Sequence, residues 1–445
     1  MDLPQTTTHG DMKEVLIISY FYPPCTLTAS QRPAGWVKYL SSFGFKPIVV
    51  TRNWEVALIQ PTDQLRDSGK EVVVETTDSF EIHYLPYRAT VRDRLFNSTN
   101  RLLKKSSKIF TFIESIGENY SNRFIPFRNL YDYSEQLIEQ HTFSALIITG
   151  NPFVQFRFGY LFNKKYKIPW IADYRDDWTT SEIIQPKGKL ARFLHSIQRQ
   201  SEQKWVGSSN LVTSVSEVYT DRISQFVNVR GATILNGFDA LLPKIVNDDF
   251  TTFKITYNGT LYDTQDIETF IRVVIRCIEV YREKIKIQVQ FPGLAYDPFQ
   301  ETRVKKLISG YDSFFLITAR IPKSEVLSLQ QTSDVLLMLT HKGKKGIPSS
   351  KLYEYLSFQK TILCFPSDED IVAETLLNTN LGKIFNYEEE VYEYLSFLIQ
   401  KKIKNEFFLP KVNEKHLMSF SVYNQVLQLG LLLSQISKTN DLGRR

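Results

Sequence analysis

Short apolar runs rich in β-branched residues recur along the chain, and a longer segment with helical periodicity follows each of them. In the first example, residues 14–20 (EVLIISY) precede a helical pattern over residues 30–43, and the apolar run of residues 47–51 (PIVVT) comes next. An apolar run without alternation is typical of a strand buried on both faces of a parallel sheet. This order of strand, helix and strand predicts a βαβ unit with a right-handed crossover.

A second set of alternating elements begins at Phe253, where an apolar run leads through a turn at Gly259 into a helical pattern. Four further apolar runs follow, at residues 286–293, 314–320, 334–340 and 361–365. Alternating strands and helices favour a parallel sheet covered by crossover helices. We therefore predict an α/β chain of two Rossmann-like domains, residues 1–240 and 241–412. Residues 413–445 are expected to form a leucine-rich helix that packs back on the first domain.

The polar and charged residues that directly follow two strands of the first half are candidate ligand contacts. One strand ends at the turn Gly150-Asn151-Pro152, and the strand within IPWIADYRDDW (residues 168–178) runs directly into Asp173, Arg175 and Asp176. Open parallel α/β sheets bind their ligands at the carboxyl ends of the strands, so these side chains are candidates for a functional site. The alternative is a structural network of ion pairs in a loop.

The most informative stretch of the second half is residues 345–365 (KGIPSSKLYEYLSFQKTILCF). Ser349 or Ser350 can cap a helix there, and the first N–H groups and the dipole of that helix favour an anion such as phosphate. Lys351 adds a cation, and Glu354, one turn later, can accept hydrogen bonds from a pair of hydroxyls such as those of ribose. The pattern suggests a nucleotide. The alternative is an ordinary surface helix with a lysine–glutamate pair and an apolar face turned to the core.

Composition limits the class of protein. With 445 residues, of which 42% are hydrophobic, the chain is long enough for two hydrophobic cores. It has no run of about 18 uncharged apolar residues, and its first residues lack the order of a secretory signal, so we expect a cytoplasmic protein. The three cysteines are far apart and the six histidines lack metal-ligand spacing, so neither disulfides nor a bound metal are expected. The first turn lacks the GxGxxG pattern of nicotinamide and flavin sites.

Positive charge is concentrated in one segment. The net charge is +6, but seven basic residues and a single acid lie between Arg88 and Lys108. Apolar residues recur at helical spacing over residues 95–116, which predicts an amphipathic helix with a cationic flank. Such a helix can rest on anionic lipid, and it would do so through Arg94, Arg101, Lys104 and Lys105. A solvated helix packed on the sheet is the alternative; no motif supports nucleic acid as a partner.

Four strings of the sequence are similar to one enzyme family: SYFYPP, IPWIADYRDDW, YNGTLY and IPSSKLYEYLSFQKTIL. On these motifs the chain resembles glycosyltransferase family 4 from about residue 14 to residue 385, and within it the bacterial enzymes of cell-surface polysaccharide biosynthesis. The resemblance implies the GT-B architecture, in which two Rossmann-like domains face each other across a cleft. It also implies retaining transfer of a sugar from a UDP- or GDP-sugar to an acceptor hydroxyl, without a metal or bound cofactor.

The resemblance also assigns roles to residues of the second domain. Lys351 would hold the diphosphate of the donor, Glu354 would hold its ribose, and the backbone at Gly259 and Thr260 would approach the phosphates. Because the donor's own phosphate oxygen takes the acceptor proton in the favoured scheme, the protein mainly positions the reactants and stabilises the departing diphosphate. The remaining expected donor contacts are Arg320, Ser349 and Ser350.

In the first domain, the resemblance places Asp173, Arg175 and Asp176 as catalytic residues opposite the reacting sugar and the acceptor. Arg32 and Asn151 are expected on the acceptor side. The acceptor itself is expected to be a saccharide linked to a lipid, with the basic helix resting on the inner face of the cytoplasmic membrane.

The chain departs from the family pattern at three positions. Gly346 stands where many members carry the first of two acids, and Thr260 and Gln265 stand where an arginine and a lysine are common. Phosphate neutralisation would then fall on Lys351, on helix N-termini, and on Arg320, Lys342 or Lys345. We favour a subgroup with rearranged phosphate contacts over a weakened enzyme.

Three other functions stay open at this point. The same fold also suits a nucleotide-sugar epimerase or hydrolase, which would consume the donor without an acceptor. The three departures are compatible with an inert sugar-nucleotide-binding protein. The basic helix alone is compatible with an adaptor for membranes or nucleic acid.

Overall fold

The computed structural model describes residues 12–55, 61–181, 186–244, 248–341, 343–347 and 349–443. The chain forms two compact units. Unit 1 consists of Met1–Leu235 together with Tyr423–Arg445, and unit 2 is Asn236–Val422. The sequence predicts boundaries after residues 240 and 412, whereas the two units divide after residues 235 and 422.

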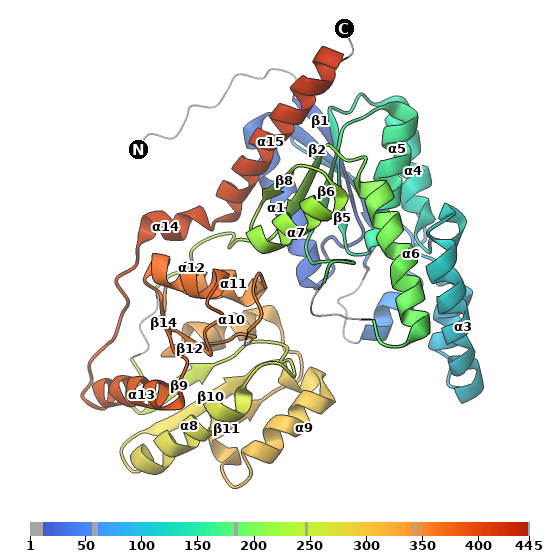
Figure 1. The fold of residues 1–445 in the computed structure, drawn as a ribbon. Coiled ribbons are helices and arrows are strands. Elements are labelled where there is room, and N and C mark those ends of the chain that lie inside the picture. Colours follow the sequence, from blue (N-terminus) through green and yellow to red (C-terminus); the bar gives the residue numbers. More distant parts are fainter. Residues whose placement is uncertain are drawn as a thin grey trace. The chain divides into compact units, whose positions relative to one another are not determined.

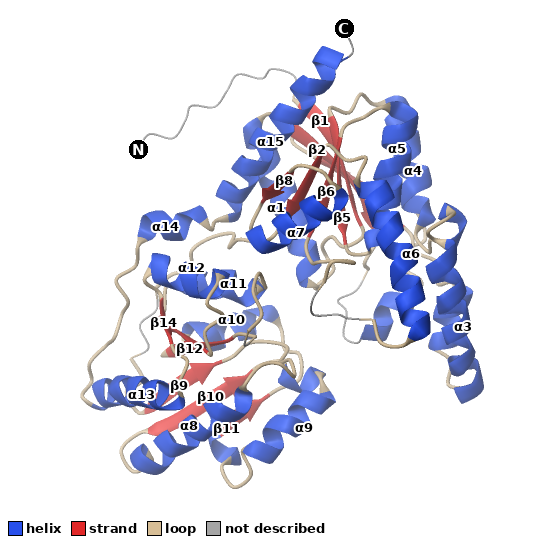
Figure 2. Ribbon diagram, viewed as in Figure 1, coloured by secondary structure: helices blue, strands red, loops and turns tan. Residues whose placement is uncertain are grey.

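Unit 1 is built on an eight-stranded sheet with the order β3-β4-β2-β1-β5-β6-β7-β8 and with helices on both faces (Figure 2). Its central strand β1 is flanked by β2 and β5 in parallel register, for example Ile17 opposite Val49 and Ile147. The side chains of β1 from Val15 to Ile18 are fully buried, as a strand covered on both faces requires. The strands are β1 Lys13–Ser19, β2 Phe45–Arg52, β3 Val73–Thr76, β4 Glu81–Leu85, β5 Ala145–Gly150, β6 Trp170–Tyr174, β7 Leu211–Ser214 and β8 Gly231–Thr233.

One edge of this sheet differs from the parallel arrangement that the sequence predicts. Strand β3 pairs antiparallel with β4, and the short connection between Thr76 and Glu81 explains the difference. A connection of a few residues can join only antiparallel neighbours, because a parallel pair needs a long crossover.

The helices of unit 1 are α1 Gln31–Tyr39, α2 Val91–Phe96, α3 Arg101–Gly117, α4 Arg128–Gln140, α5 Phe156–Tyr166, α6 Lys189–Val206, α7 Glu217–Val227 and α15 Val422–Gly443 (Figure 1). Short 3-10 helices are η1 Thr28–Ser30, η2 Leu40–Phe43, η3 Pro61–Leu65, η4 Asn122–Phe124 and η5 Phe153–Gln155. The predicted basic helix over residues 95–116 is wrong in one respect, because it is two helices. The polar residues between α2 and α3 interrupt it, and Asn100 caps α3 by accepting a bond from the amide of Leu102 at 2.9 Å.

The C-terminal helix α15 packs on the first unit, as the sequence predicts. The ring of Tyr423 lies 5.5 Å from that of Tyr39 and 5.3 Å from that of Phe43. The side-chain oxygen of Gln425 accepts a hydrogen bond from the amide of Leu235 at 2.8 Å. A Cβ at Gly430 would meet Phe43 at 3.0 Å, so a small residue permits this close approach.

Unit 2 is built on a six-stranded sheet in the order β11-β10-β9-β12-β13-β14, in which every pair is parallel. The strands are β9 Thr252–Thr256, β10 Lys286–Phe291, β11 Phe315–Ile317, β12 Val335–Leu339, β13 Ile362–Phe365 and β14 Gly382–Ile384. The helices are α8 Ile267–Tyr281, α9 Pro298–Leu307, α10 Lys323–Gln331, α11 Ser350–Phe358, α12 Ile371–Thr379, α13 Glu388–Ile403 and α14 Glu414–Ser419, with η6 Leu294–Tyr296 and η7 Asp312–Phe314. The predicted fold class, two α/β units with parallel sheets, is confirmed.

Within the described ranges, no helix is long and apolar enough to cross a bilayer. The same residues contain no group of three or more His, Cys, Asp or Glu side chains arranged to hold a metal ion.

Candidate functional site

Two glycine turns lie together at the carboxyl edge of the unit 2 sheet. Gly259 follows β9 with a φ of +87°, and Gly293 follows the neighbouring β10 with a φ of +84°. A Cβ on Gly293 would lie 3.9 Å from the Cα of Gly259. Both positions need glycine because other residues rarely adopt this backbone conformation. The turns therefore expose backbone at the edge where parallel sheets bind ligands.

Helix α11 begins at the same edge. It starts at Ser350, and Ser349 occupies the N-cap position with an extended backbone. The side chain of Ser349 makes no capping hydrogen bond, so the cap suggested by the sequence is not formed. The amide of Leu352 in the first turn donates to the carbonyl of Ser349 at 3.0 Å, and the helix dipole favours an anion at the amides that precede it.

The ammonium group of Lys351 joins this helix to the first glycine turn. Its Nζ donates to the hydroxyl of Tyr257 at 2.8 Å and to the carbonyl of Thr260 at 2.7 Å. A Cβ on Gly259 would lie only 3.3 Å from Cε of Lys351, so a side chain there would press on the lysine. Burial lowers the pKa of Lys351 to about 7, although Glu354 acts to raise it.

Glu354 has one oxygen held in place and one oxygen available. Its Oε1 accepts from the side-chain amides of Asn258 at 2.9 Å and of Gln330 at 2.7 Å, whereas no described residue bonds to its Oε2. The hydroxyl of Tyr355 accepts from the backbone amide of Asn258 at 2.9 Å and so fixes that residue as well. The carboxylate is oriented before any ligand arrives, and Oε2 can accept a ligand hydroxyl.

Sequence reasoning missed three residues of this arrangement: Tyr257, Asn258 and Gln330. The first two lie in the YNGTLY string next to Gly259, so their position at a strand end was an available signal. Gln330 comes from the last turn of α10 and is fully buried. No local pattern distinguishes it from other polar residues of that helix.

The positions that depart from the family pattern have structural contacts in this chain. Gln265 is 4% exposed, its Nε2 donates to the carbonyl of Leu339 at 2.6 Å, and its Oε1 accepts from the hydroxyl of Tyr257 at 3.1 Å. Gly346 has a φ of +73°, and its amide donates to the carboxylate of Asp370. Neither position contributes a charge to the site.

The other expected cations are placed differently. The guanidinium of Arg320 lies over the ring of Tyr296, 4.0 Å from its centre, on the loop that follows β11. Lys345 is exposed, and Lys342 lies outside the described residues. Lys351 is therefore the cation that the described structure places against the glycine turns.

In unit 1, Arg32 and Asp173 form a buried ion pair. The guanidinium Nη2 lies 2.7 Å from Oδ1 of Asp173, and Nε donates to Oδ2 at 3.1 Å. Arg32 also donates through Nη1 to the carbonyl of Ile234 at 2.8 Å, and Thr213 donates to Asp173 at 2.7 Å. Arg32 is 8% exposed and Asp173 is fully buried. The pair ties β6 to α1 and to the chain segment after β8.

The charged string after β6 divides into inward and outward residues. Asp177, like Asp173, is buried, and it pairs with Arg222 at 2.9 Å. Arg175 and Asp176 instead bond to each other at the surface, where 54% of the Asp176 side chain is exposed. Asn151 is exposed in the loop after the neighbouring strand β5. The ion-pair alternative describes Asp173 and Asp177, and a functional role for Arg175 and Asp176 stays a prediction.

The cationic residues of α2 and α3 are exposed except for Arg92, which pairs with Asp93 and Glu114, and apolar residues beside them are exposed as well. Leu102, Ile109 and Ile113 are 75%, 62% and 47% exposed. At 100° per residue they fall on one stripe of α3, with the cations on one side of it. The exposed cations are Arg94, Arg101, Lys104, Lys105 and Lys108.

No protein-family model and no curated protein sequence matches the chain. Solved structures do match it in fold. A sucrose-phosphate synthase from Thermosynechococcus elongatus is 11% identical with a TM-score of 0.59, and the alignment covers 96% of this chain and 100% of that one. A glycosyltransferase from Rickettsia africae is 11% identical over 96% and 99% of the two chains, with a TM-score of 0.57.

A third similar structure is a trehalose-6-phosphate protein from E. coli bound with UDP-2-fluoro glucose. It is 10% identical over 95% of this chain and 99% of that chain, with a TM-score of 0.58. The likeness shows the fold. The chain therefore has the two-unit α/β fold of these proteins, the GT-B fold, over nearly its whole length.

The Arg32–Asp173 pair predicts a large loss of stability when one partner is removed. Arg32→Met leaves a buried carboxylate without its cation, which should cost about 3–5 kcal/mol of unfolding free energy. All five tryptophans belong to unit 1, so tryptophan fluorescence during urea unfolding reports on this unit. Arg128→Met, which breaks an exposed pair with Asp132, is the control and should cost about 0.5 kcal/mol at most. Equal losses in the two variants would contradict the structural role of the buried pair.

If a diphosphate such as UDP binds beside Lys351, the lowered pKa of this lysine predicts that the affinity depends on pH. A bound diphosphate favours the charged ammonium, so binding above pH 7 requires proton uptake by the free protein. Affinity should fall between pH 7.5 and 9 by up to about tenfold per pH unit. Isothermal titration calorimetry in buffers of different ionisation enthalpy measures both the affinity and the proton uptake. Lys351→Arg, which stays charged, should lose the slope; a flat wild-type profile would refute the prediction.

Proposed function

We propose that the chain is a retaining glycosyltransferase that moves a sugar from a UDP- or GDP-sugar to a saccharide acceptor. One observation carries the proposal: the Lys351 ammonium, the two glycine turns and the oriented carboxylate of Glu354 lie together at the carboxyl edge of the unit 2 sheet. A cation beside exposed backbone suits a diphosphate, and an available carboxylate oxygen suits a ribose. The fold shared with the sugar-phosphate synthases supports the same assignment.

The donor contacts follow from this arrangement. The diphosphate lies against the turn of Gly259 and the amides at the start of α11, and Lys351 balances part of its charge. Glu354 accepts from the ribose hydroxyls through Oε2 while Asn258 and Gln330 hold Oε1. Thr260 contributes its backbone, and Ser349 and Ser350 contribute their position at the helix start. Binding energy at these fixed groups orients the sugar for transfer.

In the proposed reaction, the bond between the sugar C1 and the diphosphate oxygen breaks, and the acceptor oxygen bonds to C1 on the same face. The acceptor proton passes to the departing phosphate oxygen, so no protein nucleophile and no added co-reactant are needed. Lys351 and the first-turn amides stabilise the charge that develops on the leaving group. We assign Arg175, Asp176 and Asn151 to the acceptor side. For Asp173 and Arg32 we propose a positioning role, because their charged groups are buried in each other.

We further propose that the enzyme acts in bacterial cell-surface polysaccharide biosynthesis and that its acceptor is a lipid-linked saccharide. The exposed stripe of Leu102, Ile109 and Ile113 beside the cations of α3 supports it. Apolar side chains can enter the interface of a bilayer while lysines contact anionic headgroups. The protein would then work on the cytoplasmic face of the membrane, where lipid-linked acceptors are presented.

The central test is a thermal-shift screen of UDP-, GDP- and ADP-sugars. One donor should stabilise the wild type by about 2.7 kcal/mol at a hundred times its dissociation constant. Lys351→Ala and Glu354→Gln should abolish most of this shift, whereas Lys383→Ala, an exposed lysine on β14 of the same sheet, should retain it. The absence of a shift with every nucleotide sugar would remove the basis of the proposal.

Assays of the wild type with and without an acceptor separate transferase activity from its alternatives. A transferase releases nucleoside diphosphate only when an acceptor is present. Consumption of the donor without an acceptor indicates an epimerase, which forms another nucleotide sugar, or a hydrolase, which releases the nucleoside diphosphate. Saturable binding without donor consumption indicates an inert binding protein. The inert-protein alternative rests on the three departures at Gly346, Thr260 and Gln265.

Membrane contact has a separate test. The triple variant Arg101→Gln, Lys104→Gln, Lys105→Gln should weaken binding to vesicles with 30% anionic lipid about a hundredfold, since each cation near the surface contributes roughly 1 kcal/mol. Ile109→Ser should weaken binding to the same vesicles through loss of apolar contact. Lys164→Gln, Lys165→Gln, Lys167→Gln at the end of α5 is the matched control and should bind like the wild type. Equal binding by both triple variants in vesicle sedimentation would exclude this surface.

A further inference from the structure

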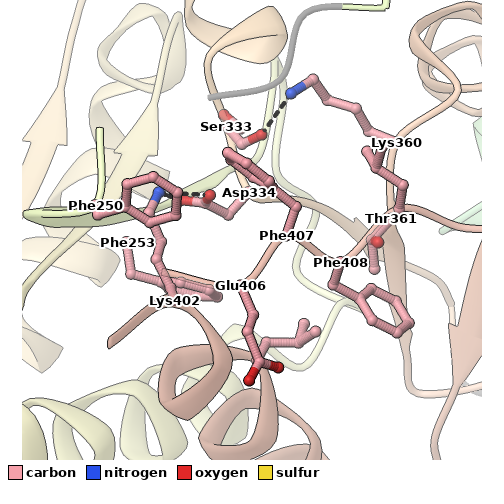
Figure 3. A pocket seen from close by; sticks show the side chains of 12 residues that line it. Phe250, Phe253, Ser333, Asp334, Lys360, Thr361, Lys402, Glu406, Phe407 and Phe408 are labelled. Atoms are coloured by element: carbon pink, nitrogen blue, oxygen red, sulfur yellow. Dashed lines mark hydrogen bonds and ion pairs between the residues drawn. The ribbon is translucent and has the colours of Figure 1, made fainter. Parts of the chain in front are cut away.

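A second cavity lies at the opposite, amino edge of the unit 2 sheet (Figure 3). Most of its polar lining comes from residues just before two strands, Ser333 and Asp334 before β12 and Lys360 and Thr361 before β13. The end of α13 and the loop after it add Lys402 and Glu406. The donor contacts instead follow the strands at their carboxyl ends. Because a five-residue strand spans roughly 16 Å, the cavity is a separate place from the proposed donor site.

The cavity is small and mostly apolar in its outer part. Its volume is about 60 Å³, which is room for roughly four water-sized groups. Phe407 and Leu409 are 51% and 55% exposed, and the ring of Phe407 lies 4.9 Å from that of Phe250. The apolar lining consists of Phe250, Phe253, Leu398, Phe407, Phe408 and Leu409.

Two buried lysines and one carboxylate give the inner part of the cavity a positive balance. Lys402 is 5% exposed, and its Nζ lies 2.6 Å from both carboxylate oxygens of Asp334, so this pair neutralises itself. Lys360 is 8% exposed and donates from Nζ to the backbone carbonyl of Ser333 at 2.9 Å. An ammonium has three donors, and a neutral carbonyl does not balance its charge. Burial lowers the pKa of Lys360 to about 8, so the ammonium is mostly charged at neutral pH.

A buried hydroxyl provides the second, independent observation. Thr361 is 3% exposed, and its Oγ1 has no hydrogen-bond partner among the described residues. Its side chain is one of those that line the cavity (Figure 3). A buried polar atom without a partner costs about 1–3 kcal/mol, so such atoms are rare unless a ligand or water completes them. The hydroxyl and the Lys360 ammonium are two donors on consecutive residues beside one cavity.

We propose that this cavity binds the carboxylate end of a small organic acid with a short hydrocarbon body. The Lys360 ammonium and the Thr361 hydroxyl donate to the carboxylate, and the phenylalanine and leucine side chains cover the hydrocarbon. Glu406, the other carboxylate of the lining, pairs with Lys401 at 2.5 Å, so the Lys360 ammonium is the charge of the lining without a paired carboxylate, which matches a monoanion. A phosphate dianion fits less well, because the carboxylates of Asp334 and Glu406 lie in the same lining and the outer walls are otherwise apolar. The proposal does not depend on the sugar-transfer assignment.

The test uses butyrate as the probe on the full chain, with saturation-transfer NMR and calorimetry to measure its dissociation constant. Wild type should bind butyrate saturably and n-butylammonium not at all. Lys360→Met should weaken butyrate binding by about tenfold or more, and the isosteric Thr361→Val by roughly two- to tenfold, as expected for charged and neutral hydrogen bonds. Lys286→Met, an exposed lysine at the start of β10 on the same sheet edge, is the matched control and should bind like the wild type.

Several outcomes would overturn the proposal. The first is the absence of saturable butyrate binding to the wild type up to 50-fold a weak dissociation constant of about 1 mM. The second is unchanged butyrate binding in Thr361→Val. The third is displacement of bound butyrate by an equal concentration of inorganic phosphate. If Lys360→Met fails to fold, Thr361→Val decides, because Thr361 bonds to no described residue through its hydroxyl. UDP-sugar binding, measured in parallel, should be unaffected by Thr361→Val.

Discussion

The contact between Lys351 and the turn after β9 organises the candidate donor site. The ammonium bonds to Tyr257 and to the carbonyl of Thr260, so it holds the start of α11 against a loop that lies some ninety positions earlier in the chain. Only glycine at position 259 leaves space for this contact and adopts its backbone conformation. The same enclosure lowers the pKa of the lysine, because a buried ammonium without a full counter-charge is costly. An anion at this edge would supply that counter-charge.

The end of strand β6 in unit 1 carries both a buried charged residue, which forms an ion pair, and an exposed one. Asp173 is buried and holds Arg32, whereas Asp176 is exposed and its partner Arg175 is partly buried. Removing either member of a buried pair leaves an uncompensated charge, so the pair fixes the positions of α1, β6 and the segment after β8. Arg175 and Asp176 therefore follow a strand whose position the buried pair fixes.

The three departures from the family pattern acquire structural explanations. Gln265 braces the loop of Tyr257 and the end of β12, and Gly346 supplies a positive φ and an amide for Asp370. Thr260 offers its carbonyl to Lys351. A charged side chain at position 265 would bury its charge among these groups, since the position is almost fully enclosed. In the proposed donor site, charge balance for a diphosphate would accordingly depend on Lys351 and on backbone amides.

The sequence by itself determined the alternation of strands and helices, the two units, the return of the C-terminal helix, and the stretch with Lys351 and Glu354. These features follow from local periodicity and from turn residues, which act over a few positions. The tertiary structure decided which charges are buried, because Asp173 and Asp176 look alike in sequence and differ only in which way the chain turns them. The tertiary structure also placed Gln330 beside Glu354 and formed the cavity beside Thr361, because both depend on residues that the order of strands in the sheet brings together. Contacts between distant segments leave no local pattern, and only the folded chain reveals them.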